Sequence, residues 1–210
     1  MRDYVQWHKE YDDPGSELSW RLRTVQGYIS AALDERAGGP VQVVSLCAGE
    51  GRDIVDVLSR RPDALRAKVT LIELHPEIAA AARRRASGAG LPDVEVRVAD
   101  AGSTDSLQGA VPADLVLLVG IFGNISEHDI TGTVAAVPQF CKLGATILWS
   151  RGRDREDING MVRSWFRAAG CSELAYDTLE TGSRPAAGAF RFTGQPQPLV
   201  PGQRLFSFLR

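Results

Sequence analysis

The sequence contains few cysteines and histidines and no long apolar run. Its 210 residues include three cysteines, at positions 47, 141 and 171, and no CxxC pair. A small, odd number of widely spaced thiols indicates neither a disulfide framework nor a zinc site, so a reducing cytoplasm is the expected compartment. No apolar run approaches the roughly 20 residues that a membrane span requires. The N-terminus, MRDYVQWHKEYDD, also lacks the apolar stretch of a signal peptide.

An excess of charge of one sign is absent as well. The 24 basic and 26 acidic residues give a net charge of −2. This balance does not favour a strongly basic nucleic-acid surface, and nothing in the composition indicates an oligomeric state. Apolar residues make up 44% of the chain and charged residues 24%, which is typical of a globular protein. We expect one domain over residues 1–210, with an N-terminal segment and helix at 1–38 and a core at 41–210.

Short apolar runs alternate with helical patterns along most of the chain. The runs predict strands at 41–46, 68–74, 94–99, 114–119 and 145–149. The patterns predict helices at 18–36, 54–61, 76–87, 126–140 and 154–169, with Ser16 as the N-cap of the first and Asp154 as that of the last. Such alternation favours a doubly wound, mostly parallel α/β sheet flanked by helices. Strands at 174–179, 190–193 and 204–209, with no helices between them, predict an antiparallel end to the sheet.

Three features with ligand-binding chemistry follow three successive strands. Gly49 and Gly51 form a turn after the first strand, where a ligand can approach the backbone closely. Glu73 ends the second strand and can accept hydrogen bonds from both hydroxyls of a ribose. Asp100 ends the third strand and can accept from an adenine amino group, while the N–H of Ala101 can donate to the ring. Because parallel strands end at one edge of the sheet, these residues together predict a nucleoside site.

Two classes of cofactor carry such a nucleoside. A dinucleotide-binding turn has a third glycine, but here Ile54 stands in that position. Asp53 would also repel a pyrophosphate, whereas the sulfonium and ammonium groups of S-adenosylmethionine are positive. The turn therefore favours S-adenosylmethionine, and a nicotinamide-dependent oxidoreductase is the less favoured alternative.

A clear likeness to a known family lies in four segments: 43–51 (VVSLCAGEG), 71–74 (LIEL), 98–101 (VADA) and 113–118 (ADLVLL). With these motifs, the chain resembles a class I S-adenosylmethionine-dependent methyltransferase, a family with a Rossmann-like fold. Such enzymes usually carry an acid where Ser45 stands and often a glycine where Cys47 stands, which leaves open how the methionine end of the cofactor is held. The cofactor-binding residues that the resemblance implies are Cys47, Ala48, Gly49, Gly51, Asp53, Glu73, Leu74, Asp100, Ala101, Gly120 and Ile121.

Two further segments are candidates for the acceptor side. The resemblance places the loop at 120–126 against the methionine part of the cofactor, with Ile121 or Phe122 as an apolar wall and Asn124 as a polar contact. Alternatively, Asn124 only turns the chain before the next helix. The N-terminal segment is rich in aromatic residues and could close over the site, where His8 or Tyr11 could accept a proton from the acceptor. The alternative is that this segment packs on the outside of the sheet.

The expected function is methyl transfer from S-adenosylmethionine to a small-molecule acceptor, at an oxygen or a nitrogen. The donor is already activated, so the protein chiefly positions the reactants and excludes water. No metal is expected to take part. The alternative is a non-catalytic module of the same fold that binds the cofactor or docks a partner.

Overall fold

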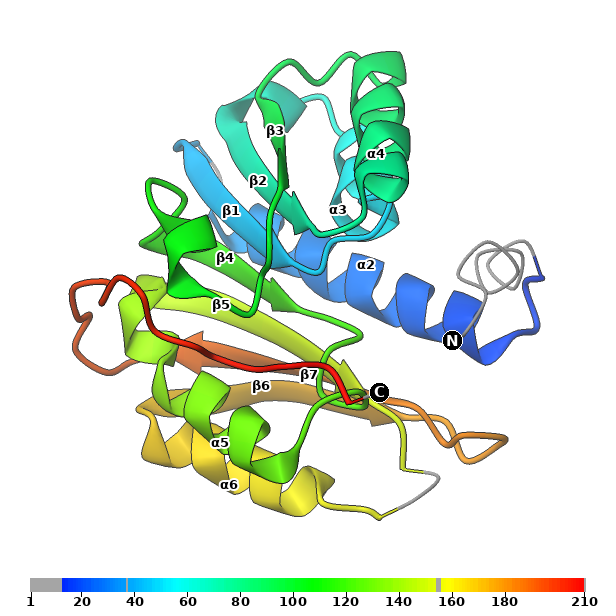
Figure 1. Cartoon of the computed structure of the whole chain (residues 1–210). Coiled ribbons are helices and arrows are strands. Elements are labelled where there is room, and N and C mark those ends of the chain that lie inside the picture. Colours follow the sequence, from blue (N-terminus) through cyan, green and yellow to red (C-terminus); the bar gives the residue numbers. More distant parts are fainter. Residues whose placement is uncertain (1–12, 37, 154–155, 210) are drawn as a thin grey trace.

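The computed structural model describes residues 13–36, 38–153 and 156–209 (Figure 1). Its centre is a seven-stranded sheet in the order β3-β2-β1-β4-β5-β7-β6. The strands are β1 (Val41–Leu46), β2 (Ala67–Glu73), β3 (Val94–Val98), β4 (Ala113–Leu118), β5 (Cys141–Arg151), β6 (Cys171–Thr178) and β7 (Ala186–Phe192). The first five strands are parallel, whereas β7 runs antiparallel to both β5 and β6. The predicted fold class is confirmed.

Helices cover both faces of the sheet. The helices α2 (Glu17–Glu35), α3 (Arg52–Leu58) and α4 (Pro76–Gly88) pack on one face, and α5 (Glu127–Ala135) and α6 (Asn159–Ala168) pack on the other (Figure 1). Strand β4 shows why both faces need cover. Leu115 and Leu117 belong to the core on the α2 side, and Val116 and Leu118 to the core on the α5 side. Burial of each such side chain stabilises the fold by about 1.5–3 kcal/mol.

Two helices begin at a serine that caps them, and the first of these caps, Ser16, was predicted. The Ser16 side chain accepts a hydrogen bond from the Ser19 N–H at 3.1 Å and begins α2. Ser126 accepts from the Asp129 N–H at 3.1 Å and begins α5. The helix predicted at 126–140 is too long, because α5 ends at Ala135 and a 3₁₀ turn, Val137–Gln139, follows. Pro138 lies in this turn and has no N–H with which to continue an α-helix.

Two other predicted elements differ from the structure. The helix expected from residue 154 begins at Asn159, and Asp154 lies outside the described residues. The preceding loop is held by Arg153, whose side chain donates to the Leu179 and Arg184 carbonyls and pairs with Glu180. The strand expected at 204–209 is an extended segment with two isolated bridges, to the loops after β3 and β4.

None of the described helices is long and apolar enough to cross a membrane.

Candidate functional site

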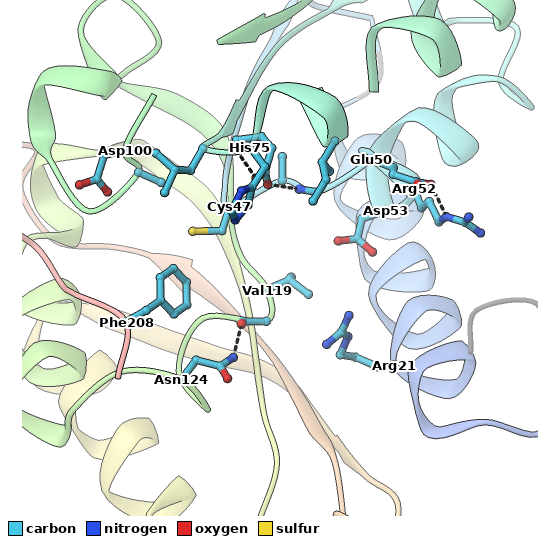
Figure 2. A pocket seen from close by; sticks show the side chains of 17 residues that line it. Arg21, Cys47, Glu50, Arg52, Asp53, His75, Asp100, Val119, Asn124 and Phe208 are labelled. Atoms are coloured by element: carbon cyan, nitrogen blue, oxygen red, sulfur yellow. Dashed lines mark hydrogen bonds and ion pairs between the residues drawn. The ribbon is translucent and has the colours of Figure 1, made fainter. Parts of the chain in front are cut away.

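A cavity of about 200 Å³ lies at the carboxyl ends of the parallel strands. Helix α2 contributes to one side of the cavity, and the C-terminal segment contributes to another (Figure 2). The predicted residues that line it are Cys47, Ala48, Gly49, Asp53, Glu73, Leu74, Asp100, Ala101, Gly120 and Asn124. Lining residues that the sequence analysis did not select are Arg21, Glu50, Arg52, His75, Ile78, Val119 and Phe208.

The two glycines of the turn after β1 differ in what surrounds them. Gly49 has a φ of +57°, and a Cβ there would meet nothing within 4 Å, so this backbone faces open space. Gly51 has a φ of +72°, and a Cβ there would lie 2.7 Å from Leu71 Cδ1. Gly51 is not among the described residues that line the cavity. Its role in the structure is therefore to let the turn pack closely against β2.

Glu73 braces this turn. Its side chain accepts a hydrogen bond from the Gly49 N–H at 3.0 Å and another from the His75 N–H at 2.9 Å. Glu73 is only 6% exposed, and a buried carboxylate without hydrogen bonds would be costly. The N–H groups of Gly49 and His75 supply these hydrogen bonds. Each carboxylate oxygen can accept more than one hydrogen bond, so Glu73 keeps the capacity to bind ligand hydroxyls.

Asp100 is tied to the C-terminal segment. Its Oδ1 accepts from the Gly102 N–H at 2.8 Å, and its Oδ2 pairs with Arg204 Nη1 at 2.6 Å. Partial burial raises the pKa of Asp100, but the hydrogen bonds from Arg204 and Gly102 outweigh that effect and hold the pKa below its ordinary value. Asp100 is therefore ionised at neutral pH and can accept from a ligand amino group.

Arg21 and Asp53 lie at the opposite end of the cavity from Asp100 (Figure 2). Burial raises the pKa of Asp53, and the nearby Arg21 opposes this effect. The Arg21 guanidinium also lies beside the loop after β4, since a Cβ on Gly120 would be 3.6 Å from its Nη1. This end of the cavity thus combines a carboxylate and a guanidinium, the two groups that can pair with an amino acid's ammonium and carboxylate.

Cys47 lies where β1 enters the turn, with a φ of +53°. Burial, followed by the charges of Glu73 and Asp100, raises the pKa of its thiol to about 12. The thiol is therefore protonated at neutral pH and acts as a small neutral surface of the cavity rather than as a nucleophile. Its sulfur points toward Phe208 (Figure 2).

The loop after β4 is braced from within. Asn124 Nδ2 donates to the Gly120 carbonyl at 2.9 Å, and the Gly120 N–H donates to Ser150 Oγ at 3.0 Å. Ile121 and Phe122 are 0% and 1% exposed, and neither is among the described residues that line the cavity. The expectation that one of them forms an apolar wall is wrong, because both side chains turn into the core. Val119 and Phe208 supply apolar surface instead.

Two candidates cannot be placed, since His8 and Tyr11 lie outside the described residues. Within residues 13–36, 38–153 and 156–209, no group of three or more His, Cys, Asp or Glu side chains could hold a metal ion.

The cavity fits S-adenosylmethionine in its donor and acceptor chemistry. Glu73 and Asp100 offer acceptors to the donor groups of a ribose and an adenine, and the open backbone at Gly49 leaves space for close approach. The carboxylates that line the cavity disfavour a phosphate group, which argues against a dinucleotide.

Comparison with known proteins agrees with this chemistry. A family model described as a methyltransferase domain matches residues 43–144. No curated protein matches the sequence significantly.

Solved structures share the fold at low sequence identity. Magnesium protoporphyrin IX methyltransferase from Synechocystis PCC 6803, with bound S-adenosylmethionine, is 11% identical with a TM-score of 0.72, over 91% of this chain and 92% of that one. A Burkholderia thailandensis 1,6-didemethyltoxoflavin-N1-methyltransferase is 17% identical with a TM-score of 0.63, over 90% and 87%. The cyclase SpnF is 14% identical with a TM-score of 0.60, over 80% and 81%.

The sheet order, the strand-end acids and the matched methyltransferase domain agree with one another. Residues 43–144 match a methyltransferase domain, and the chain has the fold of class I S-adenosylmethionine-dependent methyltransferases.

Proposed function

We propose that the chain methylates an oxygen or a nitrogen of a small-molecule acceptor, in the cytoplasm. The observation that carries this proposal is the cavity at the strand ends, whose lining includes the acids that suit S-adenosylmethionine and to which both α2 and the C-terminal segment contribute. The structural neighbours named for porphyrin and toxoflavin methylation act on small molecules, which supports the same class of acceptor. The three free thiols support a reducing compartment.

The cofactor would lie along the strand edge. Glu73 would accept from the ribose hydroxyls and Asp100 from the adenine amino group, with Leu74 and Ala101 beside the base. At the other end, Asp53 would pair with the ammonium of the methionine part and Arg21 with its carboxylate. Asp53 and Arg21 would thus hold the methionine end in place of the acid that related enzymes carry at the position of Ser45. Ser45 itself is 5% exposed and is not among the described residues that line the cavity.

The chain's own contribution to the reaction is positioning. S-adenosylmethionine supplies a methyl group that its sulfonium has already activated. Gly120 leaves room beside the methionine end, Asn124 holds the shape of the loop, and Val119 keeps one wall apolar. Such confinement orients the acceptor for in-line attack and excludes water. A general base is needed only when the acceptor retains its proton, and His8 and Tyr11 are the candidates for it.

A labelled-methyl assay tests this function. The protein is incubated with S-adenosylmethionine carrying a deuterated methyl group and with pools of phenols, amines and nitrogen heterocycles, and products are detected by mass. We expect at least one small molecule to gain the labelled methyl, with one S-adenosylhomocysteine formed per product. In Arg21→Ala, both product formation and S-adenosylhomocysteine affinity should fall, whereas Arg23→Ala, two residues along α2, should leave both unchanged.

Two results would contradict the proposal. In the first, the label enters RNA or protein added to a parallel assay and no small molecule is labelled. In the second, S-adenosylhomocysteine binds tightly but no acceptor of any class is methylated, which would favour the non-catalytic module. The fold alone does not decide between these outcomes, since a cyclase shares it.

A further inference from the structure

The C-terminal segment, residues 203–209, spans two loops at the edge of the cavity. Near its start, the Leu205 N–H donates to the Gly102 carbonyl at 2.7 Å, just after the end of β3. At its end, the Leu209 N–H donates to the Asn124 carbonyl at 2.8 Å, in the loop after β4. The segment is thus joined to the loops that follow two different strands of the sheet.

The packing of this segment against the loop after β3 is close. A Cβ on Gly102 would lie 2.3 Å from the Phe206 carbonyl oxygen, so glycine at this position lets the two backbones meet. Phe206 itself is 1% exposed and belongs to the core. Arg204 Nη1 lies 2.6 Å from Asp100 Oδ2 and 3.4 Å from the Phe206 carbonyl oxygen. The segment is therefore fixed in place beside Asp100.

Phe208 is the residue of this segment that faces the cavity. Its ring packs edge-on against Phe206, with centroids 5.7 Å apart and planes at 77°. Phe208 is nevertheless 46% exposed and lines the same cavity as Asp100 and Cys47 (Figure 2). An aromatic ring that is held from one side and open to a cavity offers its surface to a flat ligand group.

We propose that Phe208 belongs to the adenine subsite of this enzyme and packs against the base whose amino group Asp100 accepts. Arg204 is the positioning residue that holds the segment to Asp100. The inference rests on the cofactor site and not on the acceptor, so it stands whichever acceptor the enzyme methylates. Phe208 lies between Asp100 and Asn124, on the side of the cavity away from Arg21 and Asp53 (Figure 2), and this distance from Arg21 and Asp53 favours the base over the methionine part as the partner of its ring.

Calorimetry with two probes, S-adenosylhomocysteine and adenosine, tests this placement. Base–aromatic stacking is worth about 1–3 kcal/mol, and a half-exposed ring contributes toward the lower end, so Phe208→Ala should weaken both probes by about 5- to 10-fold. Arg21→Ala should weaken S-adenosylhomocysteine but not adenosine, because adenosine has no amino-acid part. Leu209→Ala is the matched control, since this side chain is apolar, 59% exposed and not among the described residues that line the cavity.

Arg204 is tested with the same probes and with melting temperature. Arg204→Ala should weaken adenosine binding, and Arg204→Lys should restore part of the affinity, because a lysine ammonium can still pair with Asp100. An unchanged affinity of Phe208→Ala for adenosine would overturn the proposal, as would an equal loss in Leu209→Ala. If Phe208→Ala retained both affinities but lost only methyl transfer, the ring would face the acceptor instead. A failure of the small-molecule assay would leave these binding results unaffected.

Discussion

The sharpest test of the cofactor site is the replacement of Glu73 by glutamine. This change is usually conservative, but here both backbone donors, the N–H groups of Gly49 and His75, point at the carboxylate. Glutamine has only one side-chain oxygen, and its NH₂ group would face whichever N–H the oxygen does not accept. Glu73→Gln should therefore leave one partly buried donor without its acceptor, which costs about 1–3 kcal/mol.

That cost can be measured as a lower melting temperature. In a domain of this size, 1 kcal/mol corresponds to about 2–4 °C, so the expected decrease is about 2–12 °C. Glu73→Ala should destabilise the fold no more than Glu73→Gln, because removal of the side chain lets cavity water reach both N–H groups. Loss of a hydrogen bond to a charged acceptor costs about 1.5–3 kcal/mol, so both variants should bind S-adenosylhomocysteine about 10- to 150-fold more weakly.

The assay combines thermal unfolding with calorimetry on the same preparations. Glu95→Gln is the matched control: this glutamate, on the neighbouring strand β3, pairs with Arg97 at the surface, and its loss should change stability by less than about 0.5 kcal/mol. The wild type should also bind adenosine more tightly than 2′-deoxyadenosine. The reasoning is refuted if Glu73→Gln melts and binds like the wild type, or if the deoxy probe binds better.

Four further predictions concern the turn, the methionine end, the thiol and the N-terminus. By unfolding and calorimetry, Gly51→Ala should lower stability by about 1–3 kcal/mol, from backbone strain and from overpacking against Leu71. Gly49→Ala carries only the backbone strain, so it should lower stability less, and its methyl group, which enters the open space of the cavity, should also lower S-adenosylhomocysteine affinity. Lowering the pH through the raised pKa of Asp53 protonates it, so affinity should fall there, and Asp53→Asn should flatten that part of the pH profile. Iodoacetamide at pH 8 should leave Cys47 unmodified by mass spectrometry, because a thiol with a pKa of about 12 is then only on the order of one part in ten thousand thiolate. Deletion of residues 1–14 should retain melting temperature and cofactor affinity but lower the single-turnover rate; a lower melting temperature with normal turnover would refute the lid hypothesis.

The strands and their acids could be predicted because the signals are local. Apolar runs such as 41–46 and 114–119 need cover on both faces, which predicts a parallel sheet, and parallel strands bring their ends to one edge. Glu73 therefore lies near the turn at Gly49, and Asp100 lines the same cavity. The start of α5 at Ser126 was also predictable, since an N-cap serine acts on its own next turn.

The residues that the sequence did not reveal reach the cavity through long-range packing. Arg21 lies on a helix whose apolar stripe gives no sign of which polar side chain faces the site. Phe208 lies in an apolar segment that was expected to be a strand but bridges to loops rather than to a strand. Ile121 and Phe122 were assigned to the cavity from their place after β4, but the loop turns both into the core, where the Phe122 ring lies 6.0 Å from that of Trp149.

The two ends of the cavity resemble each other, because each combines a carboxylate with a nearby arginine. Each end has a carboxylate, Asp100 after β3 and Asp53 in the first turn of α3. An arginine from a segment distant in sequence lies near each carboxylate: Arg21 near Asp53, and Arg204 paired with Asp100. A ligand that spans both ends would therefore hold α2 and the C-terminal segment to the sheet at once. Binding to the folded state alone stabilises it by about 2.7 kcal/mol at a ligand concentration of 100 times Kd. S-adenosylhomocysteine should accordingly protect α2 and residues 203–209 together from hydrogen exchange, whereas adenosine should protect residues 203–209 more than α2.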